Sequence, residues 1–301
     1  MSGQKSYAVW IAVDWGTSNL RAWAMSASGT VKDKTECGKG MSGLAQSEFE
    51  PTLISQIEPW LGTDTVPVIA CGMVGSRQGW AEAPYRTVPT TPLGAPSTVK
   101  TNDSRISMRI LPGLKQDTSP NVMRGEETQI AGFMAANPDF DGVICMPGTH
   151  TKWVHISAKE IVSFQTAMTG ELFAMLSDHS VLRHSVSGDT LDHDAFRETV
   201  SQTMSRPESL AAKLFEIRAS HLLENTDGAV SRARLSGLLI GAELASAKPY
   251  WLGQNIALVG HPRLNALYAD ALNVQGLDAA QHTGDEMTLK GLAAAYKELT
   301  L

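Results

Sequence analysis

Cysteine is scarce in this chain: its 301 residues include only three, Cys37, Cys71 and Cys145. Their odd number and wide spacing argue against a disulfide framework and against a zinc site, so we expect reduced, mostly buried thiols. Long apolar runs are missing as well, and no stretch approaches the ~18 residues of a membrane helix. The short polar start, Met1–Ser6, lacks the charged region and the cleavage site of a signal peptide. These absences predict a cytoplasmic protein.

Positive charge is also in short supply, since 25 Lys and Arg residues stand against 31 Asp and Glu residues and give a formal net charge of −6. A strongly basic face is therefore not expected, and we expect no nucleic-acid partner and no anionic membrane. Hydrophobic residues make up 43% of the chain and charged residues 19%, which is a globular composition. At this length the chain has material for two domains, each with its own core.

The first half of the chain reads as a strand-rich α/β domain. Buried apolar runs and glycine turns predict strands at 7–13, 20–26, 31–37, 66–70 and 106–111. Two helices are expected, at 47–61 with Ser47 as its N-cap and at 124–136. Between them, the four prolines within 84–104 predict a loop.

The second half repeats this theme after a break at Asn137-Pro138-Asp139, where we place the domain boundary. Its expected strands lie at 142–146, 152–156, 161–166 and 255–259. Its expected helices lie at 170–180, 192–204, 208–224, 230–247, 264–272 and 284–299. Each half begins with three strands and a tight glycine turn, which predicts two related α/β domains, 1–137 and 138–301. The last helix could pack back on the first domain.

The turn after the first strand carries the first candidate site. Gly16 permits close backbone approach, and Thr17 and Ser18 can offer N–H groups and hydroxyls to phosphate oxygens. Asp14, at the end of the strand, suits Mg²⁺, which prefers carboxylate oxygens. No segment has the Gly-x-x-x-x-Gly-Lys-Ser/Thr pattern of P-loop kinases, so phosphate binding would depend on such turns. An ordinary hairpin with Asp and Ser as turn formers is the alternative.

A second such turn, Gly148-Thr149-His150, follows the apolar strand that opens the second half. Two phosphate-facing hairpins are what a clamp on ATP needs, whereas His150 alone is more often a structural hydrogen-bonding residue. Gly260, between a strand and a helix, would help to form the floor of an adenine site. A plain strand–helix turn explains Gly260 at least as well.

Two adjacent carboxylates, Glu126 and Glu127, stand near the start of the helix at 124–136, beside Arg124. The helix dipole favours glutamate there, so capping is one explanation. The other is that one carboxylate accepts the proton of a substrate hydroxyl as it attacks the γ-phosphorus of ATP. Neighbouring helical residues point ~100° apart, so only one is expected to reach a substrate, and Glu126 is slightly preferred.

In order, the chain presents a phosphate hairpin, acids at a connecting helix, a second phosphate hairpin, an adenosine turn and a terminal helix. This order resembles that of the actin, hexokinase and Hsp70 superfamily. Seven segments narrow the resemblance to the 2-dehydro-3-deoxygalactonokinases and spread it over about residues 8–297. These segments are Asp14–Trp23, Gly72–Ser76, Pro112–Leu114, Asn121–Gln129, Met146–His150, Thr169–Leu172 and Leu235–Glu243.

The resemblance implies an α/β fold of two RNase-H-like domains that face an interdomain cleft for nucleotide and substrate. It also implies that ATP, with Mg²⁺, phosphorylates the 6-hydroxyl of 2-dehydro-3-deoxy-D-galactonate in galactonate breakdown. The expected partners are these small molecules, and a homodimer is one option for assembly. Two departures from the family are noted. Arg77 stands where the family often has Asn, which would affect substrate contacts, and His261-Pro262 replaces small residues at the adenosine turn, which would affect nucleotide binding.

A sugar-acid substrate needs a cation for its carboxylate, and the planar fork of arginine matches a carboxylate. Arg21, Arg77 and Arg124 are the candidates, of which we expect one to take this role, although each could equally be a structural ion-pair partner. Asn19 and Trp80 complete the expected substrate site. Tryptophans could wall the sugar or belong to the core instead, and those concerned are Trp15, Trp23 and Trp80.

Three other functions stay open at this stage. The nearest is the same chemistry on another sugar acid, such as 2-dehydro-3-deoxygluconate or an aldonate. A nucleotide-sensing module of the same superfamily would need a partner-binding domain, and we find no residues left over for one. A transcriptional regulator on a sugar-kinase fold would normally add a helix-turn-helix segment before residue 7, and the acidic charge also opposes it.

Overall fold

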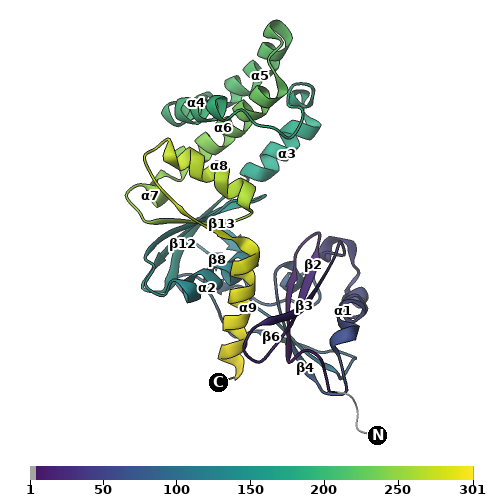
Figure 1. Ribbon diagram of the computed structural model, residues 1–301. Helices are drawn as coiled ribbons and strands as arrows, with labels where there is room; N and C mark the ends of the chain where they lie inside the picture. The colour runs from purple at the N-terminus through teal and green to yellow at the C-terminus, as the bar shows by residue number, and fades with distance from the viewer. Residues whose placement is uncertain (1–4, 301) are drawn as a thin grey trace. The chain divides into compact units, whose positions relative to one another are not determined.

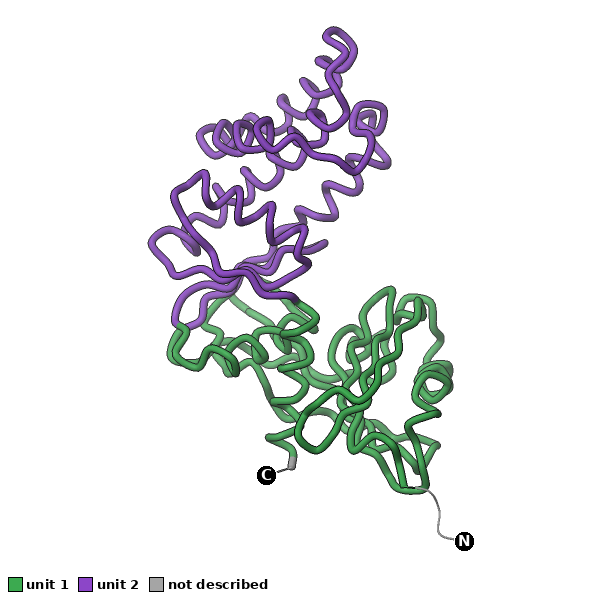
Figure 2. The backbone as a smooth tube through the Cα atoms, in the orientation of Figure 1, with its two compact units in different colours: residues 1–140, 157–163, 284–301 green, residues 141–156, 164–283 purple. Residues whose placement is uncertain are grey.

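The computed structural model describes residues 5–300, so the first four residues of the polar start Met1–Ser6 lie outside the described part. The chain divides into two compact units, which Figure 2 shows in green and purple. Unit 1 comprises the chain up to Phe140, Ser157–Ser163 and the C-terminal segment from Gly284. Unit 2 comprises Asp141–Ile156 and Phe164–Thr283. The last helix therefore belongs to the same unit as the first strand.

The core of unit 1 is a six-stranded sheet with the order β3-β2-β1-β4-β7-β6. β1 (Trp10–Trp15) is almost fully buried and pairs antiparallel with β2 (Leu20–Met25) and parallel with β4 (Val66–Cys71). β3 (Val31–Cys37) and β7 (Ile106–Ile110) extend the sheet on its two sides. These five strands are those that the sequence predicted. Buried apolar runs mark β1, β4 and β7, whereas β3 is polar, mostly exposed and lies at the edge of the sheet, after a Ser-Gly turn.

The prediction of a loop over 84–104 is wrong in part. This segment contains β5 (Arg86–Thr87), which pairs with β8 (Leu114–Gln116), and β6 (Ser97–Val99), which pairs with β7. β8 also pairs with β9 (Asn121–Met123), which gives a small three-stranded sheet. Such short strands lack a readable alternation, and their pairing partners, more than the prolines around them, decide their conformation.

The α-helices of unit 1 within residues 5–300 are α1 (Phe49–Ile57), α2 (Glu126–Ala136) and α9 (Gly284–Thr300) (Figure 1). α2 and α9 pack directly against one another. Their contact is close enough that a Cβ atom at Gly132 would lie 1.9 Å from the carbonyl oxygen of Met287. Glycine at the crossing thus lets the backbones of the two helices approach.

The predicted N-cap of the first helix is wrong. α1 begins at Phe49 rather than after Ser47, and the carboxylate of Glu48 accepts a hydrogen bond from the N–H of Ala45 at 2.7 Å. Glu48 therefore stabilises the preceding turn, and α1 follows from it without a side-chain cap. The predicted end at residue 61 is also late, because α1 ends at Ile57 and a 3₁₀ turn, Glu58–Trp60, replaces its last turn.

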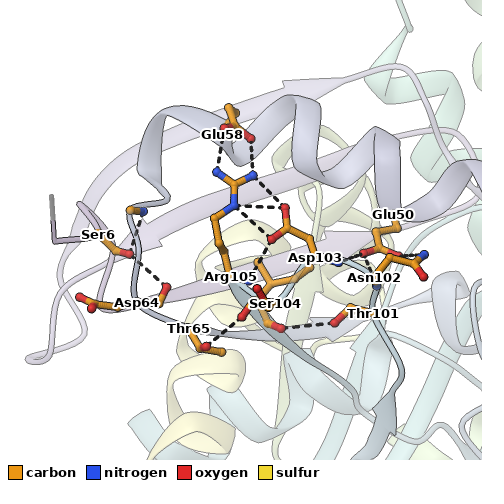
Figure 3. A network of polar contacts seen from close by, with 12 residues as sticks. Ser6, Glu50, Glu58, Asp64, Thr65, Thr101, Asn102, Asp103, Ser104 and Arg105 are labelled. Carbon is orange, nitrogen blue, oxygen red and sulfur yellow. Dashed lines mark hydrogen bonds and ion pairs between the residues drawn. The ribbon is translucent and has the colours of Figure 1, made fainter. Parts of the chain in front are cut away.

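A polar network fastens α1 and the turn after it to the loop before β7 (Figure 3). Arg105 donates to both carboxylate oxygens of Glu58, at 2.8 and 2.9 Å, and to Asp103 at 2.8 Å. Glu50, which is buried, accepts hydrogen bonds from the N–H groups of Asn102 and Asp103, each at 2.7 Å. The carboxylate of Glu50 thus satisfies loop backbone that would otherwise lack partners.

The core of unit 2 is a five-stranded sheet with the order β12-β11-β10-β13-β14. β10 (Gly142–Met146) pairs antiparallel with β11 (Thr151–Ser157) and parallel with β13 (Ile256–Gly260). β12 (Glu160–Ala167) and β14 (Ala280–Thr283) complete the sheet. The first strand of each unit therefore has an antiparallel hairpin on one side and a parallel strand on the other. This shared order confirms the prediction of two related RNase-H-like sheets.

Helices dominate the rest of unit 2, as predicted (Figure 1). They are α3 (Thr169–His179), α4 (His193–Ser205), α5 (Leu210–Glu224), α6 (Gly228–Ser246), α7 (Lys248–Trp251) and α8 (Pro262–Asn273). α6 is buried along most of its length because α3, α4, α5 and α8 all pack against it. None of the helices within residues 5–300 is long and apolar enough to cross a membrane.

Candidate active site

The β1–β2 turn of unit 1 forms an exposed, polar hairpin. Thr17, Ser18 and Asn19 are exposed, and Gly16 is partly so. With the neighbouring side chains of Asp14, Arg21, Glu36 and Cys37 and the backbone of Gly38, they line a pocket of about 730 Å³. The residues that the sequence singled out for phosphate binding thus border an open, hydrophilic space.

The segment after β3 is hydrogen-bonded to the backbone of this hairpin. The N–H groups of Gly40 and Met41 donate to the carbonyl oxygens of Ser18 and Gly16, both at 3.0 Å. The hydroxyl of Ser42 donates to the carbonyl oxygen of Thr17 at 2.9 Å. These bonds use carbonyl groups of the turn and fix its backbone. The exposed hydroxyls of Thr17 and Ser18 therefore project from a fixed turn.

Asp14 and Arg21 form an ion pair across the paired strands β1 and β2. The Nη2 atom of Arg21 lies 2.5 Å from Oδ2 of Asp14, and its Nη1 atom donates to Asp285 at the start of α9. Partial burial of the Arg21 guanidinium lowers its pKa, but attraction to Asp14 and hydrogen bonds to both carboxylates outweigh this, so the pKa of Arg21 is raised. Arg21 is therefore already engaged with two carboxylates.

Two glycines bring the start of α2 against the end of β1. Gly72 has φ +93°, and a Cβ atom there would lie 2.8 Å from the carbonyl oxygen of Trp15. Gly125 has φ +107°, and its Cβ would lie 3.4 Å from the Cα of Gly72. Only glycine adopts such backbone angles readily. The loop that begins at Gly72 therefore belongs to the same region of unit 1 as Asp14 and the start of α2.

Glu126 and Glu127 differ sharply in their surroundings. Glu127 is 1% exposed, and its carboxylate accepts hydrogen bonds from the N–H of Gly125 at 2.7 Å and the hydroxyl of Thr128 at 3.1 Å. Burial and then the charge of Glu126 raise the pKa of Glu127 to about 8. Glu126 is partly exposed, and its carboxylate accepts the N–H of Arg124 at 3.0 Å.

Cys71 links this pair of acids to Asp14. Its thiol lies 3.8 Å from Oδ1 of Asp14. Burial, followed by the charges of Asp14 and Glu127, raises the pKa of the Cys71 thiol. The three predicted acids Asp14, Glu126 and Glu127 therefore belong to one region of unit 1, although they come from different parts of the chain.

The three candidate arginines have different environments. Arg21 is paired as described, and the side chain of Arg77 is 81% exposed with only a 3.9 Å contact to Glu82. Arg124 is 8% exposed, donates from Nη2 to the carbonyl oxygen of Ala83 at 2.8 Å and lies 4.3 Å from the ring centre of Tyr85. Its Nε and Nη1 atoms are buried without a hydrogen-bond partner among residues 5–300. A buried cation left partly unpaired is costly, so Arg124 is the one that an anion would satisfy.

The tryptophans lie mainly in the core. Trp15 is fully buried and meets Phe49 and Trp80 at ring-centre distances of 5.1 and 6.2 Å. Trp80, predicted as a substrate contact, is 7% exposed and stacks on Phe49. Trp23 is partly buried beside the guanidinium of Arg21. This packing favours the core explanation for Trp15 and Trp80.

Unit 2 contains a separate pocket of about 640 Å³ next to the second hairpin. Gly148 and Thr149, which the sequence predicts to bind phosphate, line it, and most of its remaining wall is apolar. The apolar lining comes from Phe173, Leu191, Leu239, Ile240, Leu264, Ala266 and Leu267. Apolar walls with a few polar groups at one end are typical of small-molecule sites.

Other predicted residues of unit 2 lie beside this pocket without lining it. The Nε2 atom of His150 is 2.5 Å from Oε2 of Glu171, so the imidazole is tied to α3. Gly260 ends β13, and a Cβ there would lie 3.0 Å from the carbonyl oxygen of Pro147. His261 is the N-cap of α8 and accepts the N–H of Arg263 at 3.2 Å, with Pro262 as the first helical residue. His261-Pro262 thus starts a helix in a common way.

Sequence reasoning did not assign several residues of this pocket. Arg232 lies 5.0 Å from the ring centre of Phe173, and Arg263 donates to the carbonyl oxygen of Asp189. Thr169, at the start of α3, also lines the pocket. It belongs to Thr169–Leu172, a segment that resembles the kinase family but to which the sequence assigned no role. Spacing carries no signal for these residues, because helices far apart in the sequence bring them together.

Asp14 fits the ligand chemistry of Mg²⁺. No group of three or more His, Cys, Asp or Glu side chains suited to a metal occurs within the described chain. Mg²⁺ that arrives with a nucleotide needs fewer protein ligands, since it takes one or two carboxylates and otherwise water and phosphate oxygens. Oδ2 of Asp14 is occupied by Arg21, whereas Oδ1 has only the weak thiol contact with Cys71 among residues 5–300.

Known proteins similar to this chain point in one direction. A family model described as 2-keto-3-deoxy-galactonokinase matches residues 14–295. A 2-dehydro-3-deoxygalactonokinase of Escherichia coli (strain K12) is 37% identical over 290 residues, which cover 95% of this chain and 96% of that protein. A crystal structure of a Sinorhizobium meliloti protein, described as a candidate 2-dehydro-3-deoxygalactonokinase, has a TM-score of 0.88 at 39% identity and covers 96% of each chain.

A more distant structure is similar in fold alone. It is an activator of 2-hydroxyisocaproyl-CoA dehydratase from Clostridium difficile with bound ADPNP, with a TM-score of 0.50 at 11% identity over 97% of this chain and 95% of that one. Together with the repeated strand order, this similarity confirms the predicted α/β fold class.

Proposed function

This chain belongs to the 2-keto-3-deoxy-galactonokinase family, and from that premise we propose that it transfers the γ-phosphoryl group of ATP to the 6-hydroxyl of 2-dehydro-3-deoxy-D-galactonate. The observation that carries the proposal is the nearly full-length relationship to an enzyme named for this reaction. An enzyme that consumes ATP in this way would work in the cytoplasm.

The pocket of unit 2 is the proposed site for the nucleoside of ATP. Its apolar walls suit a purine, and its second hairpin, with Gly148 and Thr149, would contact phosphate oxygens. The first hairpin, in unit 1, is also proposed to bind phosphate oxygens, through Thr17 and Ser18, whose exposed hydroxyls lie on a fixed turn. Phosphoryl transfer needs mainly such positioning and the neutralisation of charge.

Mg²⁺, when bound with ATP, would neutralise charge on the phosphate oxygens, and Asp14 is the residue proposed to hold it, directly or through water. The Oδ1 atom of Asp14, which has only a weak thiol contact, is the oxygen available for this purpose. Arg21 would then orient Asp14 by holding Oδ2.

Glu126 is the proposed general base. It is partly exposed and can reach a substrate, whereas the carboxylate of Glu127 is enclosed and bonded to Gly125 and Thr128. In the reaction the proton of the 6-hydroxyl passes to Glu126, the hydroxyl oxygen bonds to the γ-phosphorus, and the bond to ADP breaks. Glu127 would act by fixing the Gly125 turn that places Glu126.

Arg124 is the arginine proposed to bind the substrate carboxylate. Arg21 already holds two carboxylates, and Arg77 extends into solvent. Arg124 instead has a buried guanidinium with two nitrogen atoms that lack hydrogen-bond partners among the described residues. The hydroxyl of Ser76 is likewise buried without a hydrogen-bond partner there. A carboxylate would match these donors.

The test is release of ADP from Mg-ATP with 2-dehydro-3-deoxy-D-galactonate, its gluconate epimer, galactonate and glucose. We expect a strong response to the first compound and weak responses to the others. A preference for the gluconate epimer would keep the kinase chemistry and replace the substrate. No response to any of the four, with ATP still bound, would overturn the proposal in favour of a nucleotide sensor.

A further inference from the structure

A buried carboxylate lies behind the pocket of unit 2, and the proposed reaction does not use it. Glu243 on α6 is 5% exposed. Its Oε1 atom accepts a hydrogen bond from Trp153 Nε1 at 2.7 Å, and its Oε2 atom accepts bonds from the hydroxyls of Tyr268, at 2.7 Å, and Thr169. The described residues supply no cation to pair with it, so these neutral donors carry the whole cost of its burial.

The directions of these hydrogen bonds follow from chemistry. The indole of Trp153 can only donate, and the tyrosine hydroxyl donates its single proton to Glu243. The hydroxyl of Thr151 lies 2.9 Å from that of Tyr268, and it also acts as a hydrogen-bond donor toward Glu243. The network thus has one acceptor centre, Glu243, toward which the bonds converge.

The partners of Glu243 come from three different elements, two of which line the pocket. Thr151 and Trp153 lie on β11, immediately after the second hairpin. Thr169 is the first residue of α3, Tyr268 lies on α8, and both line the pocket themselves. α6, which carries Glu243, also contributes lining residues, among them Ser236. One carboxylate therefore connects all four elements.

A displacement of Thr169 would also displace the second hairpin, Gly148-Thr149-His150. A Cβ atom at Gly170 would lie 2.3 Å from the carbonyl oxygen of Gly148, so the start of α3 and the hairpin are in direct backbone contact. The N–H of Glu171 also donates to the carbonyl oxygen of Thr149 at 3.0 Å. The bond between Thr169 and Glu243 is thus connected to the residues proposed to contact phosphate.

We propose that Glu243 is a positioning residue that sets the second hairpin, the start of α3 and α8 as one nucleotide-binding surface. This inference rests on the proposed function and deepens it, since it names what shapes the ATP site. Glu243 touches no reacting atom, and its effect should fall on nucleotide binding and leave the sugar acid and the chemical step unchanged.

The test is Glu243→Gln, which preserves size but replaces one accepting oxygen by an amide nitrogen that cannot accept hydrogen bonds. The dissociation constant for a non-hydrolysable ATP analogue, measured by titration calorimetry without sugar acid, should rise about 10-fold, as expected for lost bonds to a charged group. The KM for ATP should rise in parallel. The KM for the sugar acid and kcat at saturating ATP should stay within about 3-fold.

Two comparisons separate positioning from general destabilisation. Glu50→Gln alters another buried carboxylate, in unit 1, and should lower the melting temperature without changing the affinity for the analogue. Thr169→Ser retains the hydroxyl and should bind nearly as well as the parent, whereas Thr169→Val should resemble Glu243→Gln. The threonine pair also serves as the test if Glu243→Gln does not fold.

Unchanged affinity in both Glu243→Gln and Thr169→Val would overturn this inference and leave the proposed function intact. Equal losses of affinity in Glu243→Gln and Glu50→Gln would overturn it as well, because stability alone would then explain them. A parent protein that does not bind the analogue would overturn the proposed function and the inference together.

Discussion

Glu127 in unit 1 and Glu243 in unit 2 are both buried carboxylates, 1% and 5% exposed, to which the described chain supplies no cation. Burial raises the pKa of each. Their neighbours differ, because the charge of Glu126 raises the pKa of Glu127 further, whereas hydroxyl and indole donors act against burial at Glu243. Glu127 thus has an acidic neighbour in addition to its neutral donors Gly125 and Thr128, whereas Glu243 has four side-chain donors.

The same strand order thus supports two kinds of site in the two units. In unit 1 the pKa of Glu127 is strongly raised beside the other proposed catalytic acids, and strongly shifted titratable groups are common at catalytic centres. The acid of unit 2 lies behind an apolar pocket and is saturated with hydrogen bonds, which suits a structural support for a ligand site. Function is therefore carried by the side chains placed on the two sheets rather than by their common topology.

The largest expected effect comes from Asp14, which would show whether unit 1 carries the chemistry. Asp14→Ala should lower kcat by at least ~100-fold, because Mg²⁺ and the γ-phosphate would lose a proposed charge-organising ligand. Steady-state kinetics at saturating ATP and sugar acid measure it, with circular dichroism to confirm folding. Asp285→Asn is the matched control, since it removes the other partner of Arg21 and leaves Asp14 in place. Near-parental turnover in Asp14→Ala would contradict the assignment.

Substitutions of Glu126 and Glu127 test which of these two acids of unit 1 is the general base. Glu126→Gln should lower kcat about 100-fold, as loss of a general base does, while Glu127→Gln should lower it far less. Single-turnover measurements of phosphoryl transfer separate the chemical step from product release. The reverse order of effects would assign the base to the buried acid and require that it become accessible during the reaction.

Arg124 should produce an intermediate effect that is specific to the substrate. Arg124→Met should lower kcat/KM for the sugar acid about 10- to 100-fold, because a charged, bidentate contact would be lost, while the KM for ATP stays unchanged. The control is Arg77→Ala, which removes an exposed arginine and should change kcat/KM by less than about 2-fold. A substrate analogue without the carboxylate should make the parent and Arg124→Met alike. If Arg124→Met discriminates the analogue as the parent does, another residue binds the carboxylate.

Much of the fold could be predicted from the sequence because its signals are local. The strands around the two hairpins are short apolar runs that end in glycine turns, and the helices of unit 2 are long periodic segments. The errors occur where distant partners decide. β6 exists because it pairs with β7, and the start of α1 was misplaced because the carboxylate of Glu48 bonds backwards to Ala45.

The candidate sites were predictable in a similar, limited way. The hairpin of Gly16–Ser18 and the hairpin of Gly148 and Thr149 are readable as strand–glycine–hydroxyl turns. Glu243 is not, since an acid in an apolar helix gains meaning only from Trp153 and Thr169, which are 90 and 74 residues away along the chain. Trp80 is the opposite case. An aromatic residue beside a candidate loop suggests a substrate contact from the sequence, and only its packing against Trp15 and Phe49 indicates a place in the core.

The smallest expected effect is on stability and sharpens the comparison of the two buried acids. In the unfolded chain Glu127 ionises near its ordinary pKa of 4.5, whereas in the folded state it keeps its proton up to about pH 8. Between these values the folded state binds more protons, so the free energy of unfolding should fall as pH rises, by on the order of 1 kcal/mol per pH unit. Urea unfolding from pH 5 to 8 measures this slope, which Glu127→Gln should reduce. Glu243 contributes in the same sense to both proteins, so the difference between their slopes isolates Glu127. Equal slopes would mean that Glu127 is solvated or paired in solution, and its contrast with Glu126 as the accessible acid would be lost.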